Sequence, residues 1–350
     1  MTINRTNNFD LLRLIAAFQV LIWHGAVQFK VFDNMWGFLS LLFHIPGVPI
    51  FFTISGFLIS HSLERNQFNL KKYFKNRALR IYPALWVCTA ITALLLIYFV
   101  KPIILKDLLL WLAAQVSFLQ FYASPSLKTW GAGHPNGSLW SVAVELQFYL
   151  VLPVLLYVIN LPRKLWQTNL LLAAIFVVSV ILKLVINTNS WVLAHEQVHK
   201  LFGNTVLYYL HFFLTGIAIY KNFTWIEKLV KDKVLIWLII YAAYVLIACT
   251  WLKLYVNPYD VSVWGIIANT LLSMLSLSFA FSYIHLSKRL LHENDLSYGI
   301  YIYHLPVINV MLSLGFTGSI WNLIAMSAIV CLISYFSWIW VEKPAMKAKF

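Results

Sequence analysis

The stretch NFDLLRLIAAFQVLIWHG, residues 8–25, is apolar enough to enter a lipid bilayer, yet it contains Arg13 and His24. On an α-helix, eleven positions return the chain to nearly the same face, about 16 Å further along the axis. Because a polar side chain that faces lipid is costly, we expect both residues to point into a helix bundle or a wet cavity. Two simpler explanations stay open: Arg13 as a cation that snorkels to the interface, and His24 as a histidine with one interhelical hydrogen bond.

The composition extends this reading to the whole chain. Its 350 residues are 61% hydrophobic and only 11% charged, and the mean hydropathy is +0.77, which is too apolar for a soluble domain of this length. The three cysteines lie in apolar runs, so we expect neither disulfides nor a metal site. The net charge of +14 is not gathered on a soluble domain, and we therefore predict no nucleic-acid partner. The chain is predicted to be a polytopic membrane protein.

Apolar stretches of about 20 residues predict the membrane-spanning helices. We predict ten, near residues 10–29, 45–61, 81–100, 139–159, 168–186, 204–220, 234–253, 262–284, 297–315 and 319–341. A further run at 107–122 is short. If it crossed, the basic loop at Arg163 and Lys164 would face outward, so we predict a re-entrant or interfacial segment there. The predicted fold class is all-α.

The distribution of lysine and arginine predicts the topology. With the N-terminus inside, eighteen of the 26 basic residues fall in inner segments, six in outer segments and two within spans. This positive-inside bias places both termini in the cytoplasm. Since there is no internal repeat and no long linker, we expect one transmembrane domain over residues 1–350.

A second stretch, GSLWSVAVELQFYLVLP at 137–153, contains Glu145, the one acidic residue in the predicted spans apart from Asp10, which is the first residue of the first span. Glu145 lies about 9 Å below the outer end of its helix, a depth similar to that of His24. A carboxylate that orients an imidazole suits general base catalysis. A proton relay in a transporter, or a buried contact that holds two helices in register, would use the same pair.

A basic segment, RNQFNLKKYFKNRALRIYPALW at 65–86, precedes the third predicted span. Arg77 and Arg80 are three residues apart, so both can face one ligand, and arginine binds phosphate groups bidentately. With Lys71, Lys72 and Tyr82 they predict a site for a phosphorylated cytoplasmic ligand. For the lysines, ordinary positive-inside bias with attraction to anionic membrane lipid is the simpler explanation.

Taken together, these motifs resemble the membrane-bound acyltransferase-3 family, in its stand-alone form without a C-terminal SGNH domain. The resemblance rests on FDLLRLIAAFQVLIWH (9–24), GVPIFFTISGFLIS (47–60), NRALRIYPALW (76–86), SLWSVAVELQFYLVLP (138–153), LSYGIYIYHLPV (296–307) and WIWVEKP (338–344). It implies transfer of an acyl group, often acetyl, from cytoplasmic acyl-CoA to a hydroxyl of a carbohydrate.

The resemblance also implies roles for individual residues. The family's Arg-x10-His pattern falls on Arg13 and His24, and its Arg-x-x-Arg pattern on Arg77 and Arg80. Glu145 is retained, but Leu146 stands where a second acid is frequent, so the resemblance favours His24 as the base. The remaining matches are predicted to be structural or to line the substrate path: Ser55, Gly56, Trp140, Ser141 and His304.

The resulting hypothesis has acyl-CoA bound from the cytoplasm by Arg13, Arg77, Arg80, Lys71, Lys72 and Tyr82. His24, oriented by Glu145, then deprotonates an acceptor hydroxyl that attacks the thioester directly. A histidyl-acyl relay stays open. Acetyl-CoA is expected as co-substrate, with no permanent cofactor and no metal.

The resemblance further implies a bacterial inner membrane and an acceptor such as O-antigen, lipopolysaccharide, exopolysaccharide or a lipid-linked glycan. The alternative function is a proton-coupled transporter or flippase of a lipid-linked glycan, and a membrane scaffold is a third class. Against a transporter, the sequence shows no inverted repeat and no paired broken helices in matching halves.

Overall fold

The computed structural model describes residues 7–31, 36–161, 164–254 and 256–348. Helices make up 79% of the structure, and these described residues contain no β-strand. The predicted all-α fold class is confirmed. Three of the basic residues that were used to predict the topology, Arg5, Arg163 and Lys349, lie outside the described residues.

Nine helices of the described chain are long and apolar enough to cross a bilayer. They are Phe9–Gln28, Leu41–Arg65, Leu70–Phe99, Gly137–Ile159, Leu165–Thr188, Glu196–Lys221, Val234–Trp251, Val263–Phe281 and Ile320–Lys347. The chain is therefore a multi-pass membrane protein, and each of these helices overlaps one of the predicted spans. The tenth predicted span, 297–315, is the buried helix α15 (Ser297–Ser313) of 17 residues. The cytoplasmic placement of the termini stays a prediction.

The run at 107–122 forms one short helix, α5 (Leu105–Gln115), which has 11 residues. At 1.5 Å per residue this helix is about 16 Å long, which is too short to cross the hydrocarbon core. The 3₁₀ turns Pro125–Thr129 and Gly137–Leu139 follow it. The observed length thus agrees with the prediction that this segment does not span the membrane.

The chain forms two compact units, and each unit is built from three separate stretches of the sequence. Unit 1 contains residues 1–16, 43–69 and 148–294, and unit 2 contains residues 17–42, 70–147 and 295–350. The helices α1 (Phe9–Gln28), α2 (Trp36–His44) and α6 (Trp140–Ile159) contribute residues to both units. Each unit is described here by itself, and the single domain over 1–350 stays a prediction.

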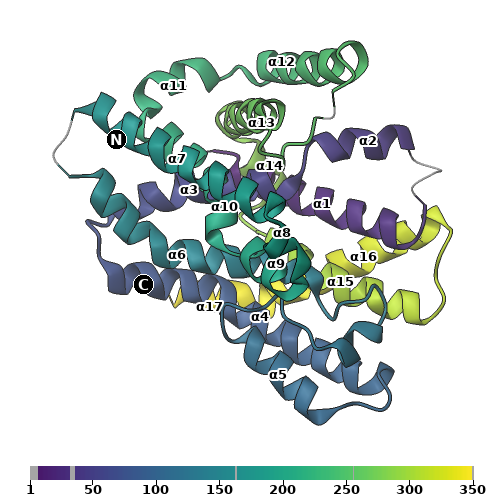
Figure 1. Ribbon diagram of the computed structural model, residues 1–350. Helices are drawn as coiled ribbons and strands as arrows, with labels where there is room; N and C mark the ends of the chain where they lie inside the picture. Colours follow the sequence, from purple (N-terminus) through teal and green to yellow (C-terminus); the bar gives the residue numbers. More distant parts are fainter. Residues whose placement is uncertain (1–6, 32–35, 162–163, 255, 349–350) are drawn as a thin grey trace. The chain divides into compact units, whose positions relative to one another are not determined.

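Unit 1 is built on a core of aromatic side chains, among which Phe57, Phe223 and Phe281 pack ring against ring. Its further helices are α3 (Gly47–Arg65), α7 (Leu165–Thr188), α8 (Ser190–Ala194), α9 (Glu196–Gly203), α10 (Val206–Lys221), α11 (Phe223–Val230), α12 (Val234–Leu246), α13 (Val263–Phe281) and α14 (Leu286–Leu291). A π-helical turn, Ile247–Trp251, extends α12. In Figure 1, α12 lies beside α13.

Glycine lets the backbones of α3 and α10 approach closely. A Cβ atom built at Gly56 would overlap the carbonyl oxygen of Phe213, and one built at Gly216 would overlap the carbonyl oxygen of Thr53. Small residues at helix contacts permit this approach in membrane proteins, where packing replaces the hydrophobic effect between helices. Gly56 thus permits a close approach of two helix backbones in unit 1.

Unit 2 contains α4 (Leu70–Phe99), α5, α15, α16 (Ile320–Ser337), a π-helical turn (Trp338–Glu342) and α17 (Lys343–Lys347). The helices α15 and α16 run side by side (Figure 1). The second half of α1 contacts α16 at Gly25. A Cβ atom built there would overlap side-chain atoms of Met326 and Leu323. This contact fixes the turn of α1 that carries His24.

Candidate functional site

The centre of the candidate site is a pair of histidines from α1 and α15 of unit 2. The Nδ1 atom of His24 lies 2.8 Å from the Nε2 atom of His304, and the two rings are stacked with centroids 5.1 Å apart. His304 is fully buried, whereas His24 is partly exposed. The sequence placed both residues among its candidates but did not pair them.

The hydrogen bonds assign the tautomer of each ring. The Nδ1 atom of His304 lies 2.7 Å from the carbonyl oxygen of Tyr301, which can only accept, so this nitrogen carries the hydrogen. With both imidazoles neutral, Nε2 of His304 must accept the hydrogen bond from Nδ1 of His24. Nε2 of His24 then keeps its lone pair. Of the four ring nitrogens in the two histidines, this is the one that can accept a proton.

The turn of α15 that carries His304 is held by two further contacts. Because Pro306 has no N–H, it cannot donate to the carbonyl of Ile302, and Asn136 Nδ2 donates to that oxygen instead at 2.8 Å. The hydroxyl groups of Ser141 and Tyr301 lie 2.6 Å apart. These bonds join the loop before α6 and the start of α6 to α15, and so support the orientation of His304.

Glu145 lies on α6 in the same unit. The hydrogen bond of His24 in the structure joins its Nδ1 atom to Nε2 of His304. In the observed geometry His304 contacts His24 directly, and the orienting role of Glu145 stays a prediction. Trp140 is the first residue of α6, one turn before Glu145.

The basic segment at 65–86 is mostly helical, because α4 begins at Leu70. Lys71 and Lys72 are exposed in its first turn, Arg77 and Arg80 follow within three turns, and the Tyr82 ring packs near Trp86 with centroids 5.6 Å apart. The predicted residues thus share one helix of unit 2.

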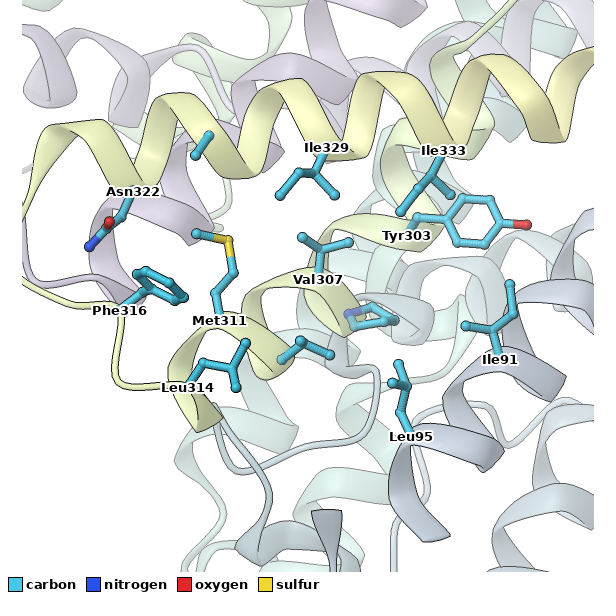
Figure 2. Close-up of a pocket in the computed structure, with 13 residues that line it drawn as sticks. Ile91, Leu95, Tyr303, Val307, Met311, Leu314, Phe316, Asn322, Ile329 and Ile333 are labelled. Atoms are coloured by element: carbon cyan, nitrogen blue, oxygen red, sulfur yellow. The ribbon is translucent and has the colours of Figure 1, made fainter. Parts of the chain in front are cut away.

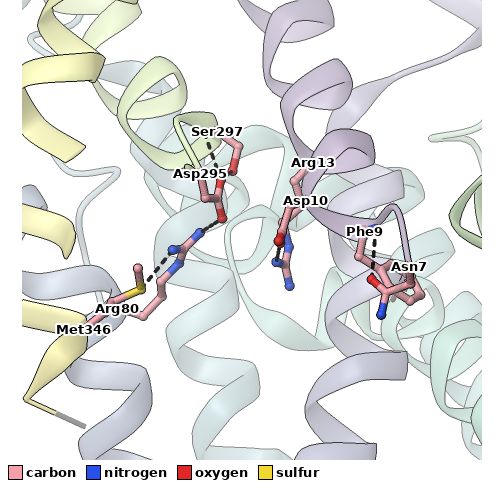
Figure 3. Close-up of polar contacts among 8 residues, drawn as sticks. All are labelled: Asn7, Phe9, Asp10, Arg13, Arg80, Asp295, Ser297 and Met346. Atoms are coloured by element: carbon pink, nitrogen blue, oxygen red, sulfur yellow. Dashed lines mark hydrogen bonds and ion pairs between the residues drawn. The ribbon is translucent and has the colours of Figure 1, made fainter. Parts of the chain in front are cut away.

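Arg80 is already engaged within unit 2. Its guanidinium pairs with Asp295 and also lies 3.2 Å from the Met346 sulfur (Figure 3). Asp295 Oδ1 in turn accepts hydrogen bonds from the backbone N–H of Ser297 at 3.1 Å and from its hydroxyl at 2.5 Å. Arg80 therefore joins α4 to the beginning of α15. Asp295 was not among the residues predicted from the sequence, although an acid just before an apolar helix often accepts from the first N–H groups of that helix.

Three predicted residues belong to unit 1. Arg13 forms an i, i+3 ion pair with Asp10 at 3.0 Å and is partly exposed (Figure 3). Ser55 is buried on α3, next to Gly56. Arg13 and His24 lie on one continuous helix, as predicted, because α1 runs without a break from Phe9 to Gln28.

An apolar cavity of about 460 Å³ lies between α4, α15 and α16 of unit 2 (Figure 2). Tyr303, Val307 and Met311 form one wall from α15, while Ile91 and Leu95 of α4 and Ile329 and Ile333 of α16 face them. This cavity is built of hydrocarbon surface, which suits a lipid chain and not a sugar or a nucleotide.

The titratable side chains of the described residues form no group of three or more histidine, cysteine, aspartate or glutamate ligands that could hold a metal ion. The histidine pair offers an oriented imidazole with a free lone pair. Tyr301, whose carbonyl fixes the tautomer of His304, was not among the sequence candidates, although it lies within the quoted motif at 296–307.

Comparison with known proteins gives one family and several relatives. A family model described as an acyltransferase domain matches residues 6–341. Nodulation protein 10 of Rhizobium leguminosarum bv. viciae is 31% identical over 98% of this chain and 94% of the relative. The O-acetyl transferase of Shigella phage Sf6 is 26% identical over 97% of this chain and 96% of the relative.

A longer relative is the peptidoglycan O-acetyltransferase OatA of Listeria monocytogenes. It is 27% identical over 98% of this chain, and the chain covers 56% of its length. No solved structure matches the chain.

Proposed function

The chain belongs to the acyltransferase domain family, and on this premise we propose that it transfers an acetyl group from acetyl-CoA to a hydroxyl of a cell-envelope carbohydrate. Two similar proteins carry the words O-acetyltransferase or O-acetyl transferase in their names, which supports acetyl as the group transferred. The observation that carries the proposal is the His24–His304 pair, which leaves Nε2 of His24 able to take a proton.

The proposed step is direct transfer. Nε2 of His24 takes the proton of the acceptor hydroxyl while the hydroxyl oxygen forms a bond to the thioester carbonyl carbon. The C–S bond then breaks, the sulfur leaves as the thiolate of CoA, and the proton on His24 neutralises it as the thiol. Glycan ester and free CoA are the products, and His24 returns to its neutral tautomer. His304 acts as a positioning residue that holds Nδ1 of His24 as the donor.

The donor is proposed to bind on the cytoplasmic side through the first turns of α4. Lys71, Lys72 and Arg77 supply positive charge for the CoA phosphates, with Tyr82 one turn further along the helix. Arg80 is held by Asp295, so its proposed contribution is to fix α4 as well as to add charge. Arg13 is proposed to neutralise charge on the donor side.

Replacing Arg77 by alanine is expected to raise the KM for acetyl-CoA about tenfold with little change in kcat, because a charge-assisted contact to phosphate is lost from the ground state and the transition state alike. Steady-state transfer by purified protein at varied acetyl-CoA measures this. Lys228→Ala, on α11, removes a cation from another inner segment and is the control. An unchanged KM for Arg77→Ala would remove Arg77 from the donor site.

Replacing His304 by alanine is expected to lower kcat about 10-fold to 100-fold, because His24 loses the acceptor that fixes its tautomer. The KM for acetyl-CoA should stay unchanged. His304→Gln places an amide oxygen near the former Nε2 position, and it should recover most of the rate. If glutamine and alanine reduce kcat equally, the positioning role of His304 is wrong.

The function itself is tested on the glycan. Envelope carbohydrate from cells that express the protein is compared by mass spectrometry with carbohydrate from cells that lack it. An added mass of one acetyl group that mild alkali removes is the expected result. Glycans that are identical in both cells would contradict acetyl transfer.

A transporter or flippase remains the second candidate, because a pair of hydrogen-bonded histidines inside a membrane also suits a proton relay. It would move a lipid-linked glycan without consuming acetyl-CoA, and its rate would depend on a proton gradient. Vesicles with and without a pH gradient distinguish the two functions, since the proposed acyl transfer requires acetyl-CoA and no gradient.

A further inference from the structure

A polar pocket of about 370 Å³ opens in unit 1, whereas the histidine pair belongs to unit 2. Lys183 and Asn187 reach it from the end of α7, and Tyr208 and Tyr209 from the first turn of α10. The segment before α13 supplies Asn257, Tyr259 and Asp260. The proposed function leaves this pocket unused.

The lysine in this pocket is buried and serves as part of its wall. Lys183 is 4% exposed, and its Nζ atom donates a hydrogen bond to the carbonyl oxygen of Tyr259 at 2.5 Å. The same atom lies 4.6 Å from the centroid of the Tyr208 ring and 5.4 Å from that of Tyr209. The carbonyl and the rings already surround this cation, so Lys183 holds the tyrosines in place. Its charge is therefore not available to bind an anionic ligand.

Other polar groups at the pocket keep hydrogen-bonding capacity. Asn187 Oδ1 accepts from the Tyr208 hydroxyl at 2.9 Å, and Asn257 Oδ1 accepts from the backbone N–H of Tyr259 at 2.9 Å, so each amide nitrogen remains a donor. Asp260 Oδ1 accepts from the N–H of Val261 at 2.8 Å. Among the described residues no hydrogen bond reaches its second carboxylate oxygen, and the residue is exposed.

Amide donors, a carboxylate acceptor and tyrosine rings together match the chemistry of a sugar. A pyranose offers hydroxyl groups that both donate and accept, and a C–H face that packs on aromatic carbon. The volume lies at the lower end of the range for small-molecule sites, which fits one sugar ring better than an extended lipid. The C-terminal end of α7 lies on the side that the charge distribution predicts to be outside.

We propose that this pocket binds one pyranose ring of the acceptor glycan and so contributes to the choice of acceptor. The proposal rests on the proposed function, because only a carbohydrate acceptor gives the pocket its role in transfer. Asp260 and Asn187 are the residues that contact the sugar hydroxyl groups.

Direct binding tests the pocket independently of catalysis. Saturation-transfer difference NMR is recorded on the purified full-length protein with the methyl pyranosides of glucose, galactose, mannose, rhamnose and N-acetylglucosamine. At least one should show saturation transfer with the wild type, and the signal should fall at least fivefold in Asp260→Asn with Asn187→Ala. Glu196→Gln, an exposed carboxylate on α9, should leave it unchanged. Absence of signal for all five sugars, or equal signal in the double variant, would overturn the proposal.

The transfer assay then separates the two claims. If the wild type acetylates glycan, the double variant is expected to raise the KM for glycan about tenfold while the KM for acetyl-CoA stays the same. An unchanged glycan KM in an active enzyme overturns the pocket assignment and leaves the proposed function standing. A wild type that binds a pyranoside at Asp260 and Asn187 yet transfers no acetyl group overturns the proposed function and the acceptor role, and leaves a sugar-binding site.

Discussion

His24→Ala is expected to lower the acetyl-transfer rate by about 10²-fold to 10⁴-fold, the range that general base catalysis contributes. The alanine removes Nε2 of His24, the nitrogen that is free to accept a proton. It is free because Nδ1 of His24 bonds to His304, whose own tautomer is fixed by the Tyr301 carbonyl. Because the donor phosphates are proposed to bind on α4, the KM for acetyl-CoA should change little. Initial rates of radiolabel transfer by equal amounts of purified protein measure the effect.

The matched control for this variant is His285→Ala, which removes an exposed imidazole at the start of α14 in unit 1. It should leave the rate within a factor of two. Since loss of His24 can also disturb the packing of α1, His24→Gln is measured in parallel, and it should be well folded and as slow as alanine. A His24→Ala protein that transfers acetyl as fast as wild type would exclude this residue as the base.

Gly56→Ala is expected to destabilise the protein by about 1–3 kcal/mol, the usual cost of overpacking a close contact. Its new methyl group would overlap the Phe213 carbonyl oxygen, which is helix backbone and cannot rotate away as a side chain can. The helices α3 and α10 would have to separate along the contact that also holds Gly216. The fraction of detergent-solubilised protein that stays monodisperse after heating measures the shift in the apparent melting temperature.

Gly203→Ala is the control for this experiment. It introduces the same methyl group at the end of α9, where nothing lies within 4 Å of the added carbon. It should melt at or slightly above the wild-type temperature, because alanine favours a helix more than glycine does. Equal melting temperatures for Gly56→Ala and Gly203→Ala would show that the two helices tolerate a wider spacing.

The apolar runs predicted the positions of the nine long helices, because a span must satisfy its backbone internally and face lipid with apolar side chains. Their ends were harder to predict. The third span was expected to begin at residue 81, yet α4 begins at Leu70. The first turns of α4 contain six basic or polar side chains, so hydropathy does not identify them as part of the helix. At α15 the predicted span of 297–315 is a helix of 17 residues.

The candidate site could be predicted as a set of residues but not as an arrangement. His24 and His304 are 280 positions apart, and no spacing rule on one helix brings them together. Glu145 is predicted as the partner of His24 because the two residues lie at a similar depth in the membrane. Depth gives only one of the three coordinates that determine whether two side chains meet. The tautomer of His304 depends on the backbone carbonyl of Tyr301. Because every residue has a backbone carbonyl, this contact cannot be predicted from residue type. The polar pocket escaped prediction for a related reason, since the irregular segment at 257–260 completes it.

The most direct test of acyl transfer is the stoichiometry of the reaction in vesicles that contain only the purified protein and the envelope glycan. Free CoA is measured by its thiol, and ester on the glycan is measured by radiolabel from acetyl-CoA. We predict one CoA released for each ester formed, with both products abolished together in His24→Ala. Glycan that crosses the vesicle membrane without release of CoA, or CoA released without ester on the glycan, would contradict the proposed function.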